Sequence, residues 1–114
     1  MAYDEYLADR VRRILTEKNV TFLDKKMMGG LVFMVNNKML CGIHVDKKFD
    51  DSLLMARIGE KAYEDNISKK ECLPMDFTGR PMKGYIFVTP NGFDLDSDLE
   101  YWIQLTLDYN SLIK

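Results

Sequence analysis

The feature that most constrains the fold of this chain is a pair of apolar runs joined by two asparagines. Leu31–Val35 is apolar at every position, Asn36-Asn37 follows, and Lys38–Val45 forms a second, mostly apolar run. Asparagine tolerates positive φ, so an Asn-Asn pair suits a two-residue hairpin turn whose twist matches that of the flanking strands. The sequence therefore predicts an antiparallel hairpin, against which the rest of the chain must pack.

Helical patterns lie near both ends of the chain. Near the start, Leu7, Val11 and Leu15 fall on one helical face. Asp4 suits the N-cap of this helix, and Asn19 tolerates the left-handed backbone that often ends one. The intervening patterns predict a weak strand at 20–26, a solvated loop at 47–51, a strand at 53–58, a short helix at 60–67, an irregular loop or strand pair at 68–84 and a strand at 84–88.

The final helix carries a capping-box signature. Ser97 is expected to cap it, and Glu100, three residues later, can reach back to the backbone of the cap. The expected apolar face consists of Leu99, Trp102, Ile103, Thr106, Leu107 and Ile113.

This order of elements predicts an α+β fold, with a largely antiparallel sheet and helices packed on one face: helix, three to four strands, short helix, one to two strands, long helix. With 114 residues the chain suits one domain, 1–114. Leu31–Val35 and Tyr85–Val88 are apolar at every position, so both faces of the sheet need cover. We therefore expect a homodimer, in which a second copy covers the face that the helices leave open.

Charge and targeting features favour a cytoplasmic protein. The 16 basic and 18 acidic residues give a net charge of −2, which disfavours broad, charge-driven binding to nucleic acid. The longest uncharged stretch, Met27–Asn37, has eleven residues, whereas a membrane span needs about 20. No secretory signal is visible at the start, so Cys41 and Cys72 are expected to be reduced thiols.

Residue patterns for catalysis and for metal binding are weak. His44 is the only histidine, and its spacing from Cys41 places the two side chains on opposite faces of a strand. Asp94, Asp96 and Asp98 alternate as in a calcium loop, but Leu105 stands where the bidentate glutamate belongs. We therefore expect no catalytic residues, no metal and no cofactor, and interpret the three aspartates as acids at a helix start.

Two groups of charged residues are candidate binding sites. Asp76, Arg80 and Lys83 lie in a segment held by two prolines, and Arg57 precedes the short helix. Together these four could bind an anion or the carboxylate of a partner. The alternative, which we favour for Arg80, is that it pairs with Asp76 and stabilises the loop. A separate basic patch could contact nucleic acid and consists of Arg10, Arg12, Arg13, Lys25 and Lys26.

Several of these segments together resemble the TfoX N-terminal domain family. They are Lys26–Gly30, the Asn36-Asn37 hairpin, Met55–Gly59 and, as the most specific part, Pro74–Tyr85. The resemblance implies an α+β domain. The best-known members are bacterial regulators of natural competence that carry a second, C-terminal domain. No catalytic residue is established for the family.

The residues and the resemblance together predict a stand-alone regulatory domain that binds a protein and has no catalytic activity. Its regulatory partner is unknown. The first alternative is a nucleic-acid-binding transcription regulator that uses the basic patch. The second is a protein that binds a small molecule or an anion.

Overall fold

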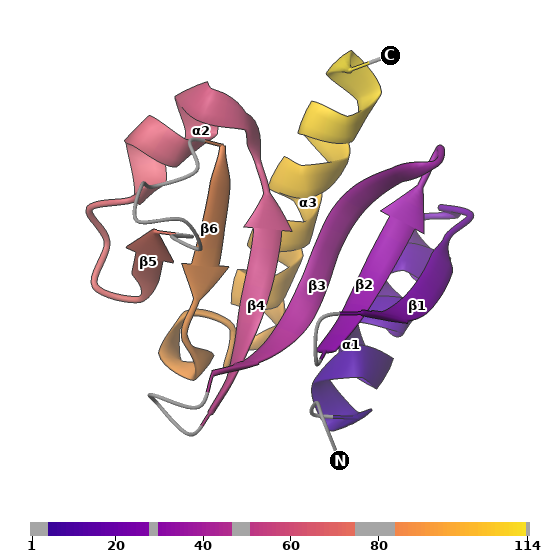
Figure 1. Ribbon diagram of the computed structural model, residues 1–114, viewed down its shortest axis with the longest axis horizontal. Coiled ribbons are helices and arrows are strands. Elements are labelled where there is room, and N and C mark those ends of the chain that lie inside the picture. The colour runs from indigo at the N-terminus through magenta and orange to yellow at the C-terminus, as the bar shows by residue number, and fades with distance from the viewer. Residues whose placement is uncertain (1–4, 28–29, 47–50, 75–83, 114) are drawn as a thin grey trace.

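One antiparallel sheet of six strands organises the part of the chain that the structure describes. This computed structural model describes residues 5–27, 30–46, 51–74 and 84–113. The strands lie side by side in the order β1-β2-β3-β4-β6-β5 (Figure 1). Their bounds are Leu23–Met27 for β1, Gly30–Val35 for β2, Lys38–Asp46 for β3, Asp51–Arg57 for β4, Cys72–Pro74 for β5 and Tyr85–Val88 for β6.

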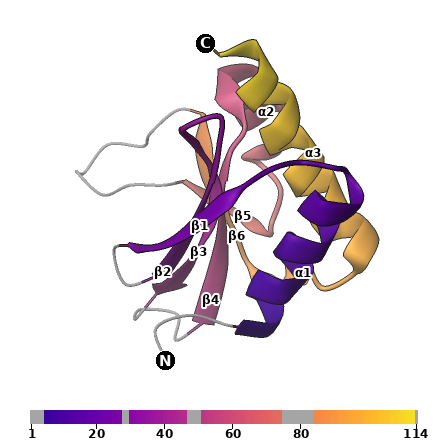
Figure 2. The same cartoon turned by 90° about the vertical axis from the view of Figure 1, so that its right-hand side faces the viewer.

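The helices of the described residues lie on one side of this sheet, as Figure 2 shows. They are α1 (Glu5–Glu17), α2 (Gly59–Asn66) and α3 (Asp96–Leu112), and a short 3-10 turn, η1 (Pro90–Gly92), precedes α3. The expected α+β class, with helices on one face of an antiparallel sheet, is confirmed.

The Asn36-Asn37 hairpin has the form that the sequence predicts. The two asparagines have φ angles of 55° and 64° and join β2 to β3. The pairing shifts between Phe33 and Met34, opposite which β3 carries one extra residue, Leu40. Because of this bulge, Leu40 and the adjacent Cys41 both join the core on the helix side.

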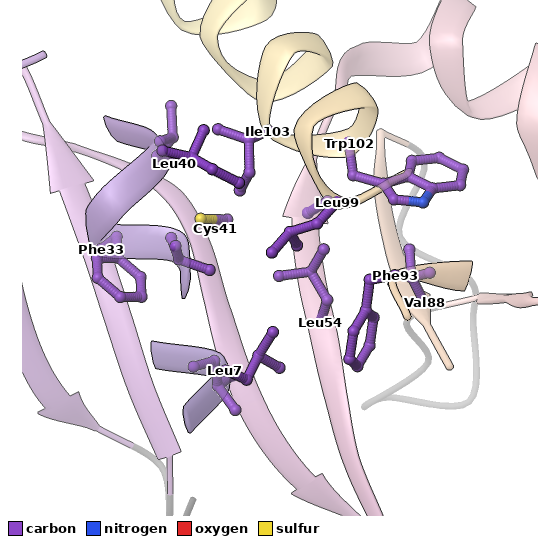
Figure 3. Packing of buried hydrophobic residues seen from close by; sticks show 14 of the residues in the cluster. Leu7, Phe33, Leu40, Cys41, Leu54, Val88, Phe93, Leu99, Trp102 and Ile103 are labelled. Carbon is purple, nitrogen blue, oxygen red and sulfur yellow. The ribbon is translucent and has the colours of Figure 1, made fainter. Parts of the chain in front are cut away.

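That core lies between the sheet and the helices (Figure 3). Leu7 of α1, Phe33 of β2, Leu54 of β4 and Ile103 of α3 are at most 1% exposed there. Their burial between the two layers holds the helices on this face of the sheet, because removing apolar side chains from water is the main force that stabilises a fold.

The opposite face of the sheet carries a smaller apolar cluster. Side chains alternate along a strand, so Leu53 and Met55 of β4 point away from the side that Leu54 faces. They pack with Val32 and Phe87, and all four are at most 7% exposed. These side chains are therefore buried within a single copy of the chain.

The start of α3 differs from the prediction. The capping box at Ser97 is wrong: the N-cap is Leu95, which makes no side-chain cap bond, and Ser97 lies inside the helix. The carbonyl of Leu95 accepts the amide hydrogens of Asp98 and Leu99 at N···O distances of 3.1 and 3.0 Å. The chain entering the helix is fixed from outside, by Arg10 of α1, a contact that no local pattern reveals.

Other expected boundaries need smaller corrections. The left-handed residue after α1 is Asn19, as predicted, with a φ of 59°. The weak strand expected at 20–26 begins only at Leu23. Of the segment 68–84, residues Cys72–Pro74 form β5 and pair with β6, while 75–83 lie outside the described residues. The loop residues 47–50 and Asp4 also lie outside them.

Candidate functional site

The end of β4, the start of β6 and the start of α2 are tied together by one backbone carbonyl. The carbonyl of Gly84 accepts the amide hydrogens of Ile58 and Gly59, at 2.8 and 3.1 Å. Both glycines have positive φ, 87° at Gly59 and 93° at Gly84. Glycine adopts this conformation without strain, so the two positions let the chain turn sharply beside Arg57.

The ring of Tyr109, from α3, lies directly against Gly59. A Cβ atom at Gly59 would be 2.5 Å from Cδ1 of Tyr109, closer than any such contact can be. The absence of a side chain at Gly59 is therefore what allows the aromatic ring to pack against this turn.

Arg57 occupies the position between two tyrosines. Its guanidinium carbon lies 5.5 Å from the ring centroids of both Tyr85, its cross-strand neighbour on β6, and Tyr109. Such contacts attract a cation through the negative faces of the rings. They supply no hydrogen-bond acceptor, and the Nε atom of Arg57 is buried without one. Among residues 5–27, 30–46, 51–74 and 84–113, no carboxylate forms an ion pair with Arg57.

Two hollows lie in this region, one of them lined by Arg57, and Glu60 and Tyr109 line both. The Arg57 pocket has a volume of about 350 Å³ and is lined by Arg57, Glu60, Gly84, Tyr85 and Tyr109. The second, the α2–α3 groove, has a volume of about 330 Å³. Its lining is mostly apolar, from Ile58, Gly59, Ala62, Leu105, Tyr109 and Leu112, with Glu60, Lys61, Asp65 and Asp108.

The sequence-based site is only partly described. Arg57 lines the pocket, whereas Asp76, Arg80 and Lys83 lie outside the described residues. Whether Arg80 pairs with Asp76 therefore stays a prediction. Gly84, which lines the pocket, directly follows that segment in the chain.

Arg10, the first member of the proposed basic patch, has a structural role. It is 7% exposed, and its Nη2 donates to the carbonyls of Phe93 and Asp94 at 2.8 and 3.2 Å. The same nitrogen donates to the carboxylate of Asp96 at 3.0 Å. Arg10 is thus turned toward the loop before α3 and away from solvent, where a contact with nucleic acid would need it.

Arg12, the second member, is paired with acids, and the other three are exposed. Arg12 donates to Asp24 at 2.9 Å and to Asp9 at 2.7 Å. The bond to Asp24 is the largest cause of the raised pKa of Arg12. Arg13, Lys25 and Lys26 are exposed. Two of the five cations of the patch, Arg10 and Arg12, are therefore paired with carboxylates.

The two thiols are poorly suited to nucleophilic chemistry. Burial raises the pKa of Cys41 to about 12 and, together with the nearby charge of Glu71, that of Cys72 to about 11. Both cysteines are free, and both stay protonated at neutral pH.

His44 stacks on Phe87, with ring centroids 5.2 Å apart, on the face of the sheet opposite Cys41. The predicted separation of Cys41 from His44 is confirmed.

No cluster of three or more His, Cys, Asp or Glu side chains in the described ranges could hold a metal ion. Within those ranges, the helices are too short or too polar to cross a membrane.

Sequence reasoning missed both tyrosines of the Arg57 pocket. The sequence patterns place Tyr85 in a strand and in the segment that resembles the family, and they assign Tyr109 to no face of its helix. The two glycines were a usable signal for this site. Gly59 and Gly84 stand at the ends of elements, where a glycine often indicates that another group packs closely against the backbone. What approaches Gly59 is 50 positions away in the chain, so the tertiary fold alone identifies it.

Comparison with models of protein families gives a match over most of the chain. The family model described as the TfoX N-terminal domain matches residues 18–109. Searches of curated proteins and of solved structures found no match.

Proposed function

Because the chain belongs to the TfoX N-terminal domain family, we propose that it is a regulatory domain that acts by binding a protein partner and not by catalysis. The observation that carries this proposal is the α2–α3 groove, a mostly apolar surface that adjoins the Arg57 pocket.

The lining of the groove resembles that of a protein interface. Ala62 and Leu105 contribute apolar surface from the facing helices, and Leu112, at 76% exposure, extends it. Lys61 and Asp108 belong to the same lining. An apolar centre with charged neighbours is typical of surfaces that bind another protein, because the centre supplies affinity and the polar groups supply specificity.

A binding role also agrees with the state of the reactive side chains. The thiols of Cys41 and Cys72 are protonated at neutral pH, and the single histidine is packed on Phe87. A nucleophile requires a neighbouring base or a lowered pKa. Burial has moved the pKa of both thiols in the opposite direction.

Partner binding is tested by affinity capture from the source cell with a groove variant. Leu112→Glu places a charge in the groove without disturbing buried residues, and Leu23→Glu, at a site 63% exposed on β1, is the matched control. We expect the same protein to be captured by the wild-type chain and by Leu23→Glu, and to be lost from Leu112→Glu. Equal capture by both variants would contradict the groove as the binding surface.

Two further measurements distinguish protein binding from nucleic-acid binding: capture from a nuclease-treated lysate and a gel-shift titration. Capture that disappears after nuclease treatment of the lysate would replace the protein-binding proposal. So would gel-shift binding at low salt that weakens steeply as salt is added, because phosphate contacts depend on counterion release.

We still propose a homodimer, but through a different surface from the one that the sequence predicts. The expectation relied on an uncovered apolar face, but Val32, Leu53, Met55 and Phe87 are already buried in one copy. The α2–α3 groove is now the apolar surface that a second copy could use. Light scattering at micromolar concentration should give twice the 13.3 kDa of the chain, falling to 13.3 kDa in Leu112→Glu. A wild-type monomer would refute the dimer.

A further inference from the structure

We infer that the Arg57 pocket binds a single carboxylate group, supplied by the protein partner of the proposed function. The inference rests on that function only for the source of the carboxylate. It starts from the state of Arg57, whose guanidinium is held between Tyr85 and Tyr109 but has no anionic partner among the described residues.

An arginine in this environment favours an anionic ligand. Its Nε has lost contact with water and has gained no acceptor. A buried donor without an acceptor costs about 1–3 kcal/mol, and an anion bonded to the guanidinium would recover part of that cost. A carboxylate can accept two parallel N–H bonds from one edge of a guanidinium, the geometry that makes arginine so common in carboxylate recognition.

The tyrosines shape the site in two ways. Their rings contact the guanidinium, so the cation is held in place before a ligand arrives. Preorganisation of this kind raises affinity, since less side-chain entropy is lost on binding. Neither phenolic hydroxyl has a hydrogen-bond partner among the described residues, so each keeps an O–H donor that a ligand oxygen could accept.

The charge of the pocket selects a carboxylate over a phosphate. Glu60 also lines it, so one carboxylate stands against the one guanidinium of the described lining. With these two charges counted, a bound monoanion leaves the described lining with one net negative charge. A phosphate, with a charge between −1.5 and −2 at neutral pH, would bring more negative charge toward Glu60 than Arg57 can offset.

The neighbouring groove indicates the kind of molecule that carries the carboxylate. The pocket and the α2–α3 groove share Glu60 and Tyr109. A partner segment could therefore place a carboxylate at Arg57 and an adjacent apolar side chain in the groove. Either an acidic side chain or a chain terminus has the required chemistry.

Binding is tested on the full chain by NMR, because a buried Nε–H exchanges slowly enough to be observed. Acetate is titrated with two reporters: the Arg57 Nε–Hε signal in the wild type, and the backbone amide signal of Gly84, which lines the pocket, in the wild type and in every variant. Sodium chloride at equal ionic strength is the blank. We expect saturable shifts with acetate, none with chloride and weaker binding of inorganic phosphate. Arg57→Gln should weaken acetate binding by about tenfold or more, whereas Arg13→Gln, at an exposed arginine of α1, should leave it unchanged.

Further variants keep the test decisive if Arg57→Gln folds poorly. Arg57→Lys keeps the charge but loses the planar pair of donors, so it too should weaken acetate binding. Tyr109→Phe keeps the ring against Gly59 and removes one donor, and should weaken it by a smaller factor. Equal shifts in sodium chloride, or unchanged binding in both Arg57 variants, would overturn the inference. Tighter binding of phosphate than of acetate would overturn the carboxylate assignment.

Two short peptides distinguish the sources of the carboxylate: acetyl-Ala-Leu with a free C-terminus, and acetyl-Glu-Leu-amide. Both offer one carboxylate next to an apolar side chain, and the one that binds more tightly identifies the source. Failure of the inference is distinguishable from failure of the proposed function. Acetate binding with no partner capture refutes only the function, and normal capture by Arg57→Gln refutes only the role of this pocket.

Discussion

At the scale of single residues, Arg10 shows how far the role of a charged side chain can depart from its place in a sequence. It lies among other arginines, yet its guanidinium is buried and donates to the carbonyls of Phe93 and Asp94. Its ion pair with Asp96 contributes less, because the side chain of Asp96 is 80% exposed and screened by water. The buried donor, more than the ion pair, stabilises the loop before α3.

Arg10→Met is therefore expected to lower the free energy of unfolding by about 2–4 kcal/mol, because it keeps the apolar stem but leaves the buried Phe93 carbonyl without a donor. Asp96→Asn should lower it by no more than about 1 kcal/mol. Urea unfolding of both variants gives the comparison. Equal losses would show that the ion pair, and not the carbonyl contacts, dominates.

The two glycines at the Arg57 pocket allow a matched comparison at this scale. Both have positive φ, so alanine at either costs about 1–2 kcal/mol in backbone strain. At Gly84 the new Cβ would meet only ordinary contacts at 3.4 Å, whereas at Gly59 it would collide with Tyr109. Gly59→Ala should thus be less stable than Gly84→Ala by about 1–3 kcal/mol in thermal or urea unfolding. Equal stability would mean that the tyrosine ring moves aside without cost.

At the scale of elements, the start of α3 is set by tertiary contacts and not by a capping side chain. Leu95 occupies the N-cap with extended backbone (φ −85°, ψ 144°), and Ser97 lies within the helix. Ser97→Ala should consequently change stability by less than about 0.5 kcal/mol, since an exposed helical position carries little energy.

Leu95→Ser should stabilise the protein by about 1 kcal/mol, because a hydroxyl at the N-cap can accept an amide hydrogen of the first turn. Leu95 is 62% exposed, so its removal costs little apolar burial. Chemical unfolding measures both variants. A loss of about 1 kcal/mol in Ser97→Ala, with no gain in Leu95→Ser, would restore Ser97 as the cap.

At the scale of the whole molecule, the buried thiols couple folding to pH. Burial holds the pKa of Cys41 near 12 and that of Cys72 near 11, above the usual value of 9.0 that each regains on unfolding. Above pH 9 the unfolded chain therefore loses protons that the folded chain keeps. The stabilisation is complete below about pH 9 and falls by about 1.4 kcal/mol per pH unit for each thiol as the pH rises toward the folded pKa values.

Unfolding measured at about pH 8 and about pH 10 tests this coupling. Lysines and tyrosines titrate in the same range, so the informative quantity is the difference between wild type and variant. Cys41→Ala should lose less stability than the wild type on going from the lower to the higher pH, even if it is less stable at both. Parallel losses in wild type and Cys41→Ala would show that the thiol titrates alike in both states.

The sequence alone determined the features that depend on neighbouring residues. The Asn36-Asn37 turn, the left-handed Asn19 and the α+β class follow from backbone preferences and from local apolar periodicity. The order of the hairpin and the helices along the chain predicts that the helices pack on one face of the sheet. Such features are fixed by interactions over a few positions, and a single sequence contains them in full.

Only the tertiary structure decided what distant residues do to one another. It buried Arg10 against the loop before α3, placed Tyr109 on Gly59 and left Arg57 between two rings without an acceptor. These outcomes depend on which helix crosses which strand. Because burial and pairing depend on the three-dimensional neighbours of a side chain, the same arginine can be a surface cation, a structural donor or a binding group, and sequence spacing does not distinguish them.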